Sequence, residues 1–170
     1  MSVANLITLF RGALVAPVVY LFLSGHRAAA AALFVVVCLG DIVDGMVARA
    51  RQEVTPLGKA LDPIVDKALY VSLLSSLLVI GEISGWAYAA FLVPQIGLGV
   101  GAIVLQLRHR QVQAARLVGK AASLVSFFAL FFLLVRWPGG LWLFYAAITL
   151  TYIAGLDYLL AARSLGKAAS

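Results

Sequence analysis

Four aspartates in one short stretch are the residues best suited to chemistry in this chain. Asp41 and Asp44 are three residues apart, and Asp62 and Asp66 are four apart. Residues three or four apart on a helix share one face, so each pair presents two carboxylates to the same side. Carboxylate oxygens are the preferred ligands of hard divalent cations. We therefore expect a divalent-metal site between the two helices that contain these aspartates.

The surrounding sequence is almost entirely apolar. The chain has 170 residues, of which 64% are hydrophobic and 12% are charged, and its mean hydropathy is +1.04. A soluble domain carries about 25% charged residues, so the composition predicts an integral membrane protein. A carboxylate near hydrocarbon costs about 2.5–3.5 kcal/mol. Four such groups together would be tolerable only if cations neutralised them.

The apolar runs set the expected architecture. At about 20 residues per span, they predict an all-α, six-transmembrane-helix bundle with short loops in a single domain, residues 1–170. The spans are expected near residues 4–24, 28–50, 59–81, 86–107, 117–136 and 140–162. Residues 55–58 are expected to form a turn, and Glu82 to lie in an ordinary exposed loop.

Positive charge predicts the orientation of these spans. With a cytoplasmic N-terminus, 11 of the 13 Lys and Arg residues fall on or near the cytoplasmic side, a strong positive-inside bias. Only Arg27 and Arg136 lie elsewhere. The acidic stretch would then face the cytoplasm of a multi-pass protein, in the inner or plasma membrane if the source is bacterial. The net charge of +6 is explained by this bias and by anionic lipid, which argues against a nucleic-acid partner.

Polar residues in the first span form a second group of interest. Asn5, Thr8 and Arg11 recur every three residues, so they share one helical side. Two interpretations are open. Arg11 could snorkel to the interface while the other two bond backbone carbonyls, or all three could face a ligand, as intramembrane ionisable groups usually do. Asp157, inside the last span, is one conceivable partner for Arg11.

Small and basic residues surround the aspartates. Gly45 and Ala48 follow Asp41 and Asp44 by one turn each and would admit a bulky ligand, although helix packing also selects small residues. A guanidinium beside a carboxylate–metal cluster, as at Arg49, suits a phosphate ligand. Arg116 and Lys120, four residues apart, are candidates for a second phosphate or for contact with lipid headgroups.

Eight of these positions form one long pattern, Asp41-x2-Asp44-Gly45-x2-Ala48-Arg49-x8-Gly58-x3-Asp62-x3-Asp66. This pattern resembles the signature of the CDP-alcohol phosphatidyltransferases, with every specified position present. The resemblance covers the whole chain, because an N-terminal Asn-Leu-Ile-Thr with Arg11 and a late Gly-Leu-Asp-Tyr segment also match. These flanking segments look most like the phosphatidylglycerophosphate synthase branch of the family.

The resemblance implies a mechanism and its residues. By this resemblance, the four aspartates would bind two Mg²⁺ or Mn²⁺ ions. Asp66 would also take the proton of the acceptor hydroxyl. CDP-diacylglycerol would be the donor and CMP the leaving group, with membrane lipids and a second copy of the chain as further partners. The cytidine and diphosphate would contact Gly45, Ala48, Arg49, Gly58, Asn5 and Thr8. Arg116 and Lys120 would hold the acceptor phosphate.

The acceptor itself stays open. Glycerol 3-phosphate is favoured, which would give phosphatidylglycerophosphate; phosphatidylglycerol, as in cardiolipin synthesis, and inositol phosphate are the alternatives. The chain has Pro94-Gln95 where that branch has an Arg-Glu pair, and Gly119-Lys120-Ala121-Ala122-Ser123 in place of a Gly-Lys-x-Lys-Thr segment. More distant alternatives are an intramembrane prenyltransferase and a small cation transporter.

Overall fold

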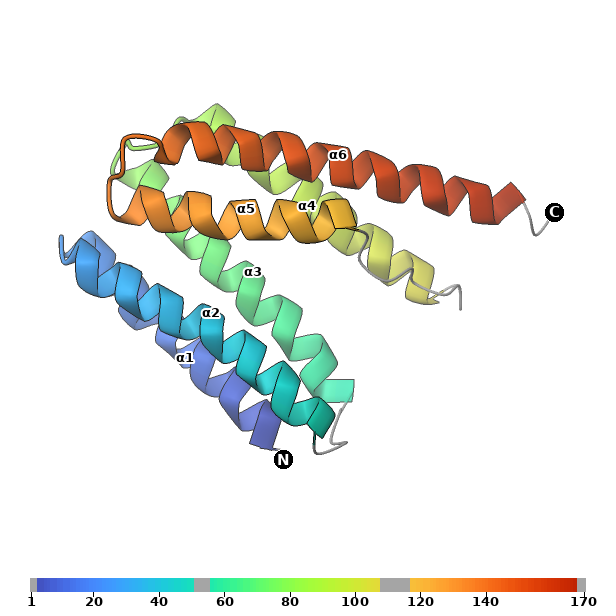
Figure 1. Ribbon diagram of the computed structural model, residues 1–170, viewed down its shortest axis with the longest axis horizontal. Helices are drawn as coiled ribbons and strands as arrows, with labels where there is room; N and C mark the ends of the chain where they lie inside the picture. The colour runs from blue at the N-terminus through green and yellow to red at the C-terminus, as the bar shows by residue number, and fades with distance from the viewer. Residues whose placement is uncertain (1–2, 51–55, 108–116, 168–170) are drawn as a thin grey trace. The chain divides into compact units, whose positions relative to one another are not determined.

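The part of the chain that its computed structural model describes, residues 3–50, 56–107 and 117–167, consists of helices and short turns (Figure 1). Six helices occupy these ranges, with no strand among them: α1 Val3–Leu23, α2 Arg27–Ala50, α3 Pro56–Val79, α4 Gly85–Leu107, α5 Leu117–Leu134 and α6 Gly140–Lys167. The all-α, six-helix prediction is confirmed. Within the described residues, three segments are long and apolar enough to cross a membrane: Asn5–Leu23, Arg27–Val47 and Gly140–Asp157.

The predicted turn before the third span is wrong. We expected residues 55–58 to form a turn, but α3 already begins at Pro56. Proline is favoured in the first turn of a helix, because its missing N–H would have no intrahelical acceptor there and its fixed φ suits the helix. Pro56 therefore starts the helix that contains Asp62 and Asp66.

The chain divides into two compact units, Met1–Glu82 with Leu130–Trp137, and Ile83–Ala129 with Pro138–Ser170. In the first unit α1 packs along both α2 and α3. Apolar side chains from all three helices are fully buried there, among them Val18, Phe34 and Leu73. The prediction that residues 1–170 form a single domain stays a prediction.

The second unit is built on the packing of α4 against α6. The rings of Phe91 and Phe144 stack with centroids 5.5 Å apart, and buried alanines such as Ala90 and Ala147 let the two backbones approach. Ser84 caps the N-terminus of α4 by accepting a hydrogen bond from the Ala87 N–H at 3.3 Å.

Hydroxyl groups inside the helices are satisfied locally. The hydroxyls of Ser76, Ser126 and Thr151 each donate to the carbonyl four residues earlier, at 2.7–2.8 Å. Large apolar side chains, by contrast, point outward, with Trp142 and Val79 each 80% exposed. Internal polar satisfaction combined with an apolar exterior is what a lipid environment demands.

The helix ends at one pole of the first unit share one turn geometry. Gly25, Gly81 and Arg136 have φ values of 83°, 78° and 54°. In each case the next residue's N–H bonds the carbonyl five residues back, for example Glu82 to Leu77 at 2.9 Å. This is the Schellman arrangement, which normally places glycine at the left-handed position. Arg136 is the exception.

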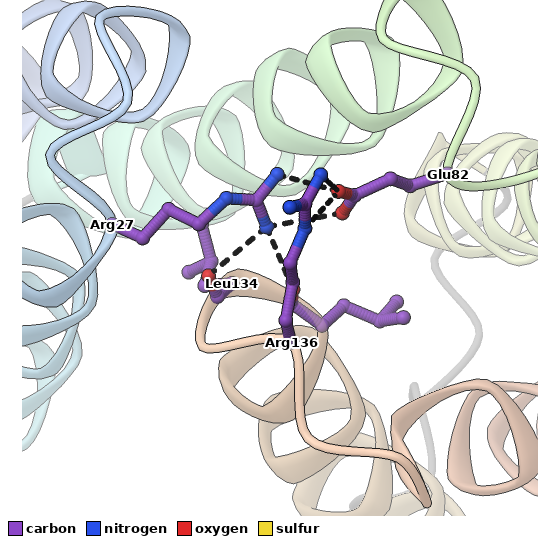
Figure 2. A network of polar contacts seen from close by, with 5 residues as sticks. Arg27, Glu82, Leu134 and Arg136 are labelled. Carbon is purple, nitrogen blue, oxygen red and sulfur yellow. Dashed lines mark hydrogen bonds and ion pairs between the residues drawn. The ribbon is translucent and has the colours of Figure 1, made fainter.

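An ion-pair network joins these helix ends (Figure 2). Arg27 donates through Nη2 and Nη1 to the two Glu82 oxygens at 2.5 and 3.1 Å, and Arg136 donates to Glu82 Oε1 at 2.7 Å. Arg27 Nη1 also reaches the Leu134 carbonyl at 3.3 Å, where a cation complements the C-terminal end of α5. Glu82 lies in a loop as predicted, but the expectation that this loop is an ordinary exposed one is wrong, because the carboxylate is only 18% exposed and binds two arginines.

Candidate active site

The guanidinium of Arg11 joins the two carboxylates of the predicted site that the structure describes. Its Nη1 donates to Asp41 Oδ1 at 2.5 Å, and its Nη2 donates to Asp66 Oδ1 at 3.0 Å. Asp41 lies on α2, Asp66 on α3 and Arg11 on α1. A single planar cation therefore links one acidic residue from each of the two predicted metal-binding helices to a third helix.

Close packing of α1 against its neighbours determines the position of the Arg11 side chain. A Cβ atom on Gly40 would lie 2.8 Å from Arg11 Cδ and 3.0 Å from its Cγ, so the arginine stem occupies the space left by this glycine. Where α1 meets α3, a Cβ on Gly12 would lie 3.3 Å from Val65 Cγ2. The two glycines bring α1 near enough to both neighbours for one side chain to reach both carboxylates.

Burial differs sharply between the cation and its partners. The Arg11 side chain is 2% exposed, whereas those of Asp41 and Asp66 are 42% and 47% exposed. A buried guanidinium requires compensating charge, which the two carboxylates supply. Arg11 takes the Oδ1 atom of each carboxylate, and a carboxylate offers about four acceptor sites. Both carboxylates are therefore bound to protein on one side and remain partly accessible to solvent.

The structure excludes one of the two interpretations of Arg11. Snorkelling would expose its charged end, but Arg11 is buried and bonded to Asp41 and Asp66, so that expectation is wrong. Asn5 and Thr8 are also buried, at 4% and 1% exposure, on the side of α1 that carries Arg11. The three-residue spacing predicted this shared face. It could not identify the partners, which lie 30 and 55 residues away in the sequence.

The remaining predicted site residues are only partly described. Gly45 lies on α2, half-buried, one turn beyond Asp41. Lys120 is exposed on α5 and belongs to the second unit. Among the residues described, no group of three or more His, Cys, Asp or Glu side chains could hold a metal. The other predicted residues have side chains outside the described residues, namely Asp44, Ala48, Arg49, Gly58, Asp62 and Arg116.

Comparison with known proteins identifies the family of this chain. The sequence pattern of the family described as CDP-alcohol phosphatidyltransferase matches residues 1–154. The chain belongs to the CDP-alcohol phosphatidyltransferase family. It is therefore an enzyme, a transferase of phospholipid synthesis that acts on a CDP-alcohol and an alcohol acceptor. The family resemblance inferred from the eight-position pattern is confirmed.

Individual relatives agree with this family. The chain is 34% identical over 169 residues to a probable phosphatidylglycerophosphate synthase of Mycobacterium tuberculosis, covering 92% of this chain and 79% of that protein. It is 30% identical over 178 residues to a CDP-diacylglycerol–glycerol-3-phosphate 3-phosphatidyltransferase of Escherichia coli K12, covering 96% of each. A protein of the same name in Shigella sonnei matches equally well.

Proposed function

We propose that this CDP-alcohol phosphatidyltransferase transfers the phosphatidyl group of CDP-diacylglycerol to glycerol 3-phosphate, giving phosphatidylglycerophosphate and CMP. The observation that carries the proposal is the pairing of Asp41 with Asp66 through Arg11, because it unites the two halves of the family signature. The acceptor is supported by the names of the relatives, two of which specify glycerol 3-phosphate as the substrate of those proteins.

The donor atoms fit the divalent ions that the family resemblance implies. Asp41 and Asp66 offer hard oxygen ligands, partly exposed, from two adjacent helices. Oxygen-only sites suit Mg²⁺ or Mn²⁺, and Asp44 and Asp62 would complete the set. Two such ions would neutralise charge on the diphosphate and favour displacement at phosphorus.

Each side chain of the site would then have its own role in the reaction. The acceptor oxygen forms a bond to the lipid-side phosphorus, the bond from that phosphorus to the CMP oxygen breaks, and CMP leaves. Asp66, which Arg11 binds at Oδ1, takes the proton of the acceptor hydroxyl. Around the donor, Asn5 and Thr8 would bind polar groups of the nucleotide, together with Gly45, Ala48, Arg49 and Gly58. Arg116 and Lys120 would bind the acceptor phosphate.

An acceptor panel tests the proposal directly. The detergent-purified protein is given CDP-diacylglycerol, Mg²⁺ and, in separate reactions, glycerol 3-phosphate, phosphatidylglycerol or inositol phosphate, and CMP release is measured. We expect release with glycerol 3-phosphate that stops when EDTA is added. Faster release with another acceptor would overturn the choice of alcohol. Membership in the family already argues against the prenyltransferase and transporter alternatives.

We further propose a cytoplasmic active site and a homodimeric membrane protein. The orientation is supported by the charge bias, in which only Arg27 and Arg136 lie on the opposite side. Both of these arginines bind Glu82. Their presence is therefore explained by this ion-pair network, and they are weak evidence about orientation. The dimer rests on the family resemblance alone.

A further inference from the structure

We propose that Arg11, seated against Gly40, is the positioning residue that fixes the orientation of Asp41 and Asp66 for metal binding. This inference rests on the proposed function, because it concerns how the ligands of that site are held. It assigns a role to two residues outside the eight-position signature. Arg11 bonds the carboxylates of Asp41 and Asp66 and takes no part in the chemical step.

The geometry of the guanidinium supports this role. Each of the two terminal nitrogens of Arg11 bonds a carboxylate from a different helix, at 2.5 and 3.0 Å. Arginine presents its donors in a rigid planar fork, whereas a lysine ammonium is a single point charge. With its stem buried, Arg11 fixes both carboxylates relative to α1 and to each other. Lysine would keep the charge and lose this double constraint.

The absence of a side chain at Gly40 determines where the Arg11 guanidinium lies. An alanine methyl at this position would lie 2.8 Å from Arg11 Cδ, closer than Cβ atoms approach their neighbours, and 3.0 Å from Arg11 Cγ, which is also a tight contact. These are mid-stem atoms of a side chain fixed at both ends, by its backbone and by its two ion pairs. The methyl group would therefore move the guanidinium. The substitution alters the position of the cation without altering any charge.

The expected effect follows from how metal ligands are oriented. Asp41 and Asp66 are about half exposed, so packing alone constrains them weakly. Residues that hydrogen-bond metal ligands commonly contribute about 10–100-fold to metal affinity or activity. We therefore expect that displacing or replacing the Arg11 guanidinium weakens divalent-ion binding by about 10–100-fold.

The experiment compares charge-conserving variants of the full-length protein in detergent. Mn²⁺ alone is titrated into the wild type, Gly40→Ala, Arg11→Lys and Gly97→Ala, and free Mn²⁺ is counted by electron paramagnetic resonance. Gly97 is a helical glycine whose Cβ would meet nothing within 4 Å, so its variant gains the same helix propensity without a clash. We expect about 10–100-fold weaker Mn²⁺ binding for Gly40→Ala and Arg11→Lys, and wild-type binding for Gly97→Ala.

The outcomes separate this inference from the proposed function. Wild-type Mn²⁺ affinity in folded Gly40→Ala and Arg11→Lys would overturn the positioning role and leave the proposed reaction intact. Should Gly40→Ala fail to fold, the Mn²⁺ affinity of Arg11→Lys alone tests the positioning role, because the lysine substitution adds no atom beside Gly40. A wild-type protein that binds no Mn²⁺ would overturn the metal-dependent mechanism, and the positioning role with it. CMP release at saturating Mn²⁺ should recover most of its wild-type rate in Arg11→Lys, since the defect is in metal affinity.

Discussion

Asp66 is both a partner of Arg11 and the proposed base of the reaction. Arg11 binds its Oδ1, and the proposed reaction uses this carboxylate as the proton acceptor. Asp66→Asn keeps the size and one acceptor oxygen but replaces that base with an amide, which cannot take the proton. We expect turnover to fall by at least about 100-fold, while CDP-diacylglycerol binding, measured with labelled lipid, is largely kept. Near-normal CMP release by this variant would contradict the assignment of the base.

Arg136 has a backbone conformation that is costly for any residue with a Cβ. Its φ of 54° lies in the left-handed region, which costs a non-glycine residue about 1–2 kcal/mol. Its side chain is 69% exposed, so its ion pair with Glu82 contributes about 1 kcal/mol at most. We therefore expect Arg136→Gly to be at least as stable as the wild type, and Arg136→Ala to be about 1 kcal/mol less stable than Arg136→Gly. Unfolding in mixed detergent micelles measures both, and equal stability of the two variants would contradict the strain argument.

At the scale of the helices, Glu82 connects the ends of α2, α3 and α5. Partial burial raises the pKa of Glu82, but the hydrogen bonds from Arg27 and Arg136 outweigh it, so the pKa lies below its ordinary value of 4.5. A carboxylate with a lowered folded pKa stabilises the protein above its unfolded pKa and loses that effect as pH falls through the folded value. The network should thus be fully effective above pH 4.5 and weaken progressively below it.

The variant Glu82→Gln tests this network. At pH 7 we expect it to lower the free energy of unfolding by about 1–3 kcal/mol, because it removes charge-assisted hydrogen bonds to the half-buried Arg27. Arg136→Gln is the matched control: it removes only the exposed partner and should cost less than about 1 kcal/mol. The gap between the wild type and Glu82→Gln should close as pH falls below 4.5. A gap that stays constant down to pH 3 would exclude the lowered pKa as its cause.

The helices could be predicted from the sequence because each depends on a local property, a run of about 20 apolar residues. The predicted span 28–50 and the observed α2, Arg27–Ala50, differ by one residue at the start. The contacts between helices could not be predicted in the same way. Arg27 and Glu82 lie 55 residues apart, as do Arg11 and Asp66, and no sequence periodicity relates such positions. Gly40 was missed for the same reason, because its role becomes visible only where the Arg11 stem crosses α2.

At the scale of the whole molecule, the predicted membrane orientation would place the aspartates and most basic residues on one side of the membrane. The positive-inside bias was the only argument available from the sequence, since it needs no knowledge of contacts. The structure adds that Arg27 and Arg136, the two residues that oppose the bias, are both bound by Glu82. The opposite side therefore carries less effective positive charge than the sequence count suggests, which strengthens the predicted orientation.

Labelling of single cysteines tests this orientation without reference to activity. Cys38 is the chain's one cysteine, so Cys38→Ala provides a cysteine-free background into which Ser24→Cys or Lys120→Cys is introduced. Both positions are exposed, and with a cytoplasmic N-terminus they lie on opposite sides of the membrane. In intact bacterial cells with a permeable outer membrane, a membrane-impermeant maleimide should label Cys at position 24 at once, and at position 120 only after the inner membrane is opened. Labelling in the reverse order would place the paired carboxylates of Asp41 and Asp66 on the outer face, away from cytoplasmic nucleotides.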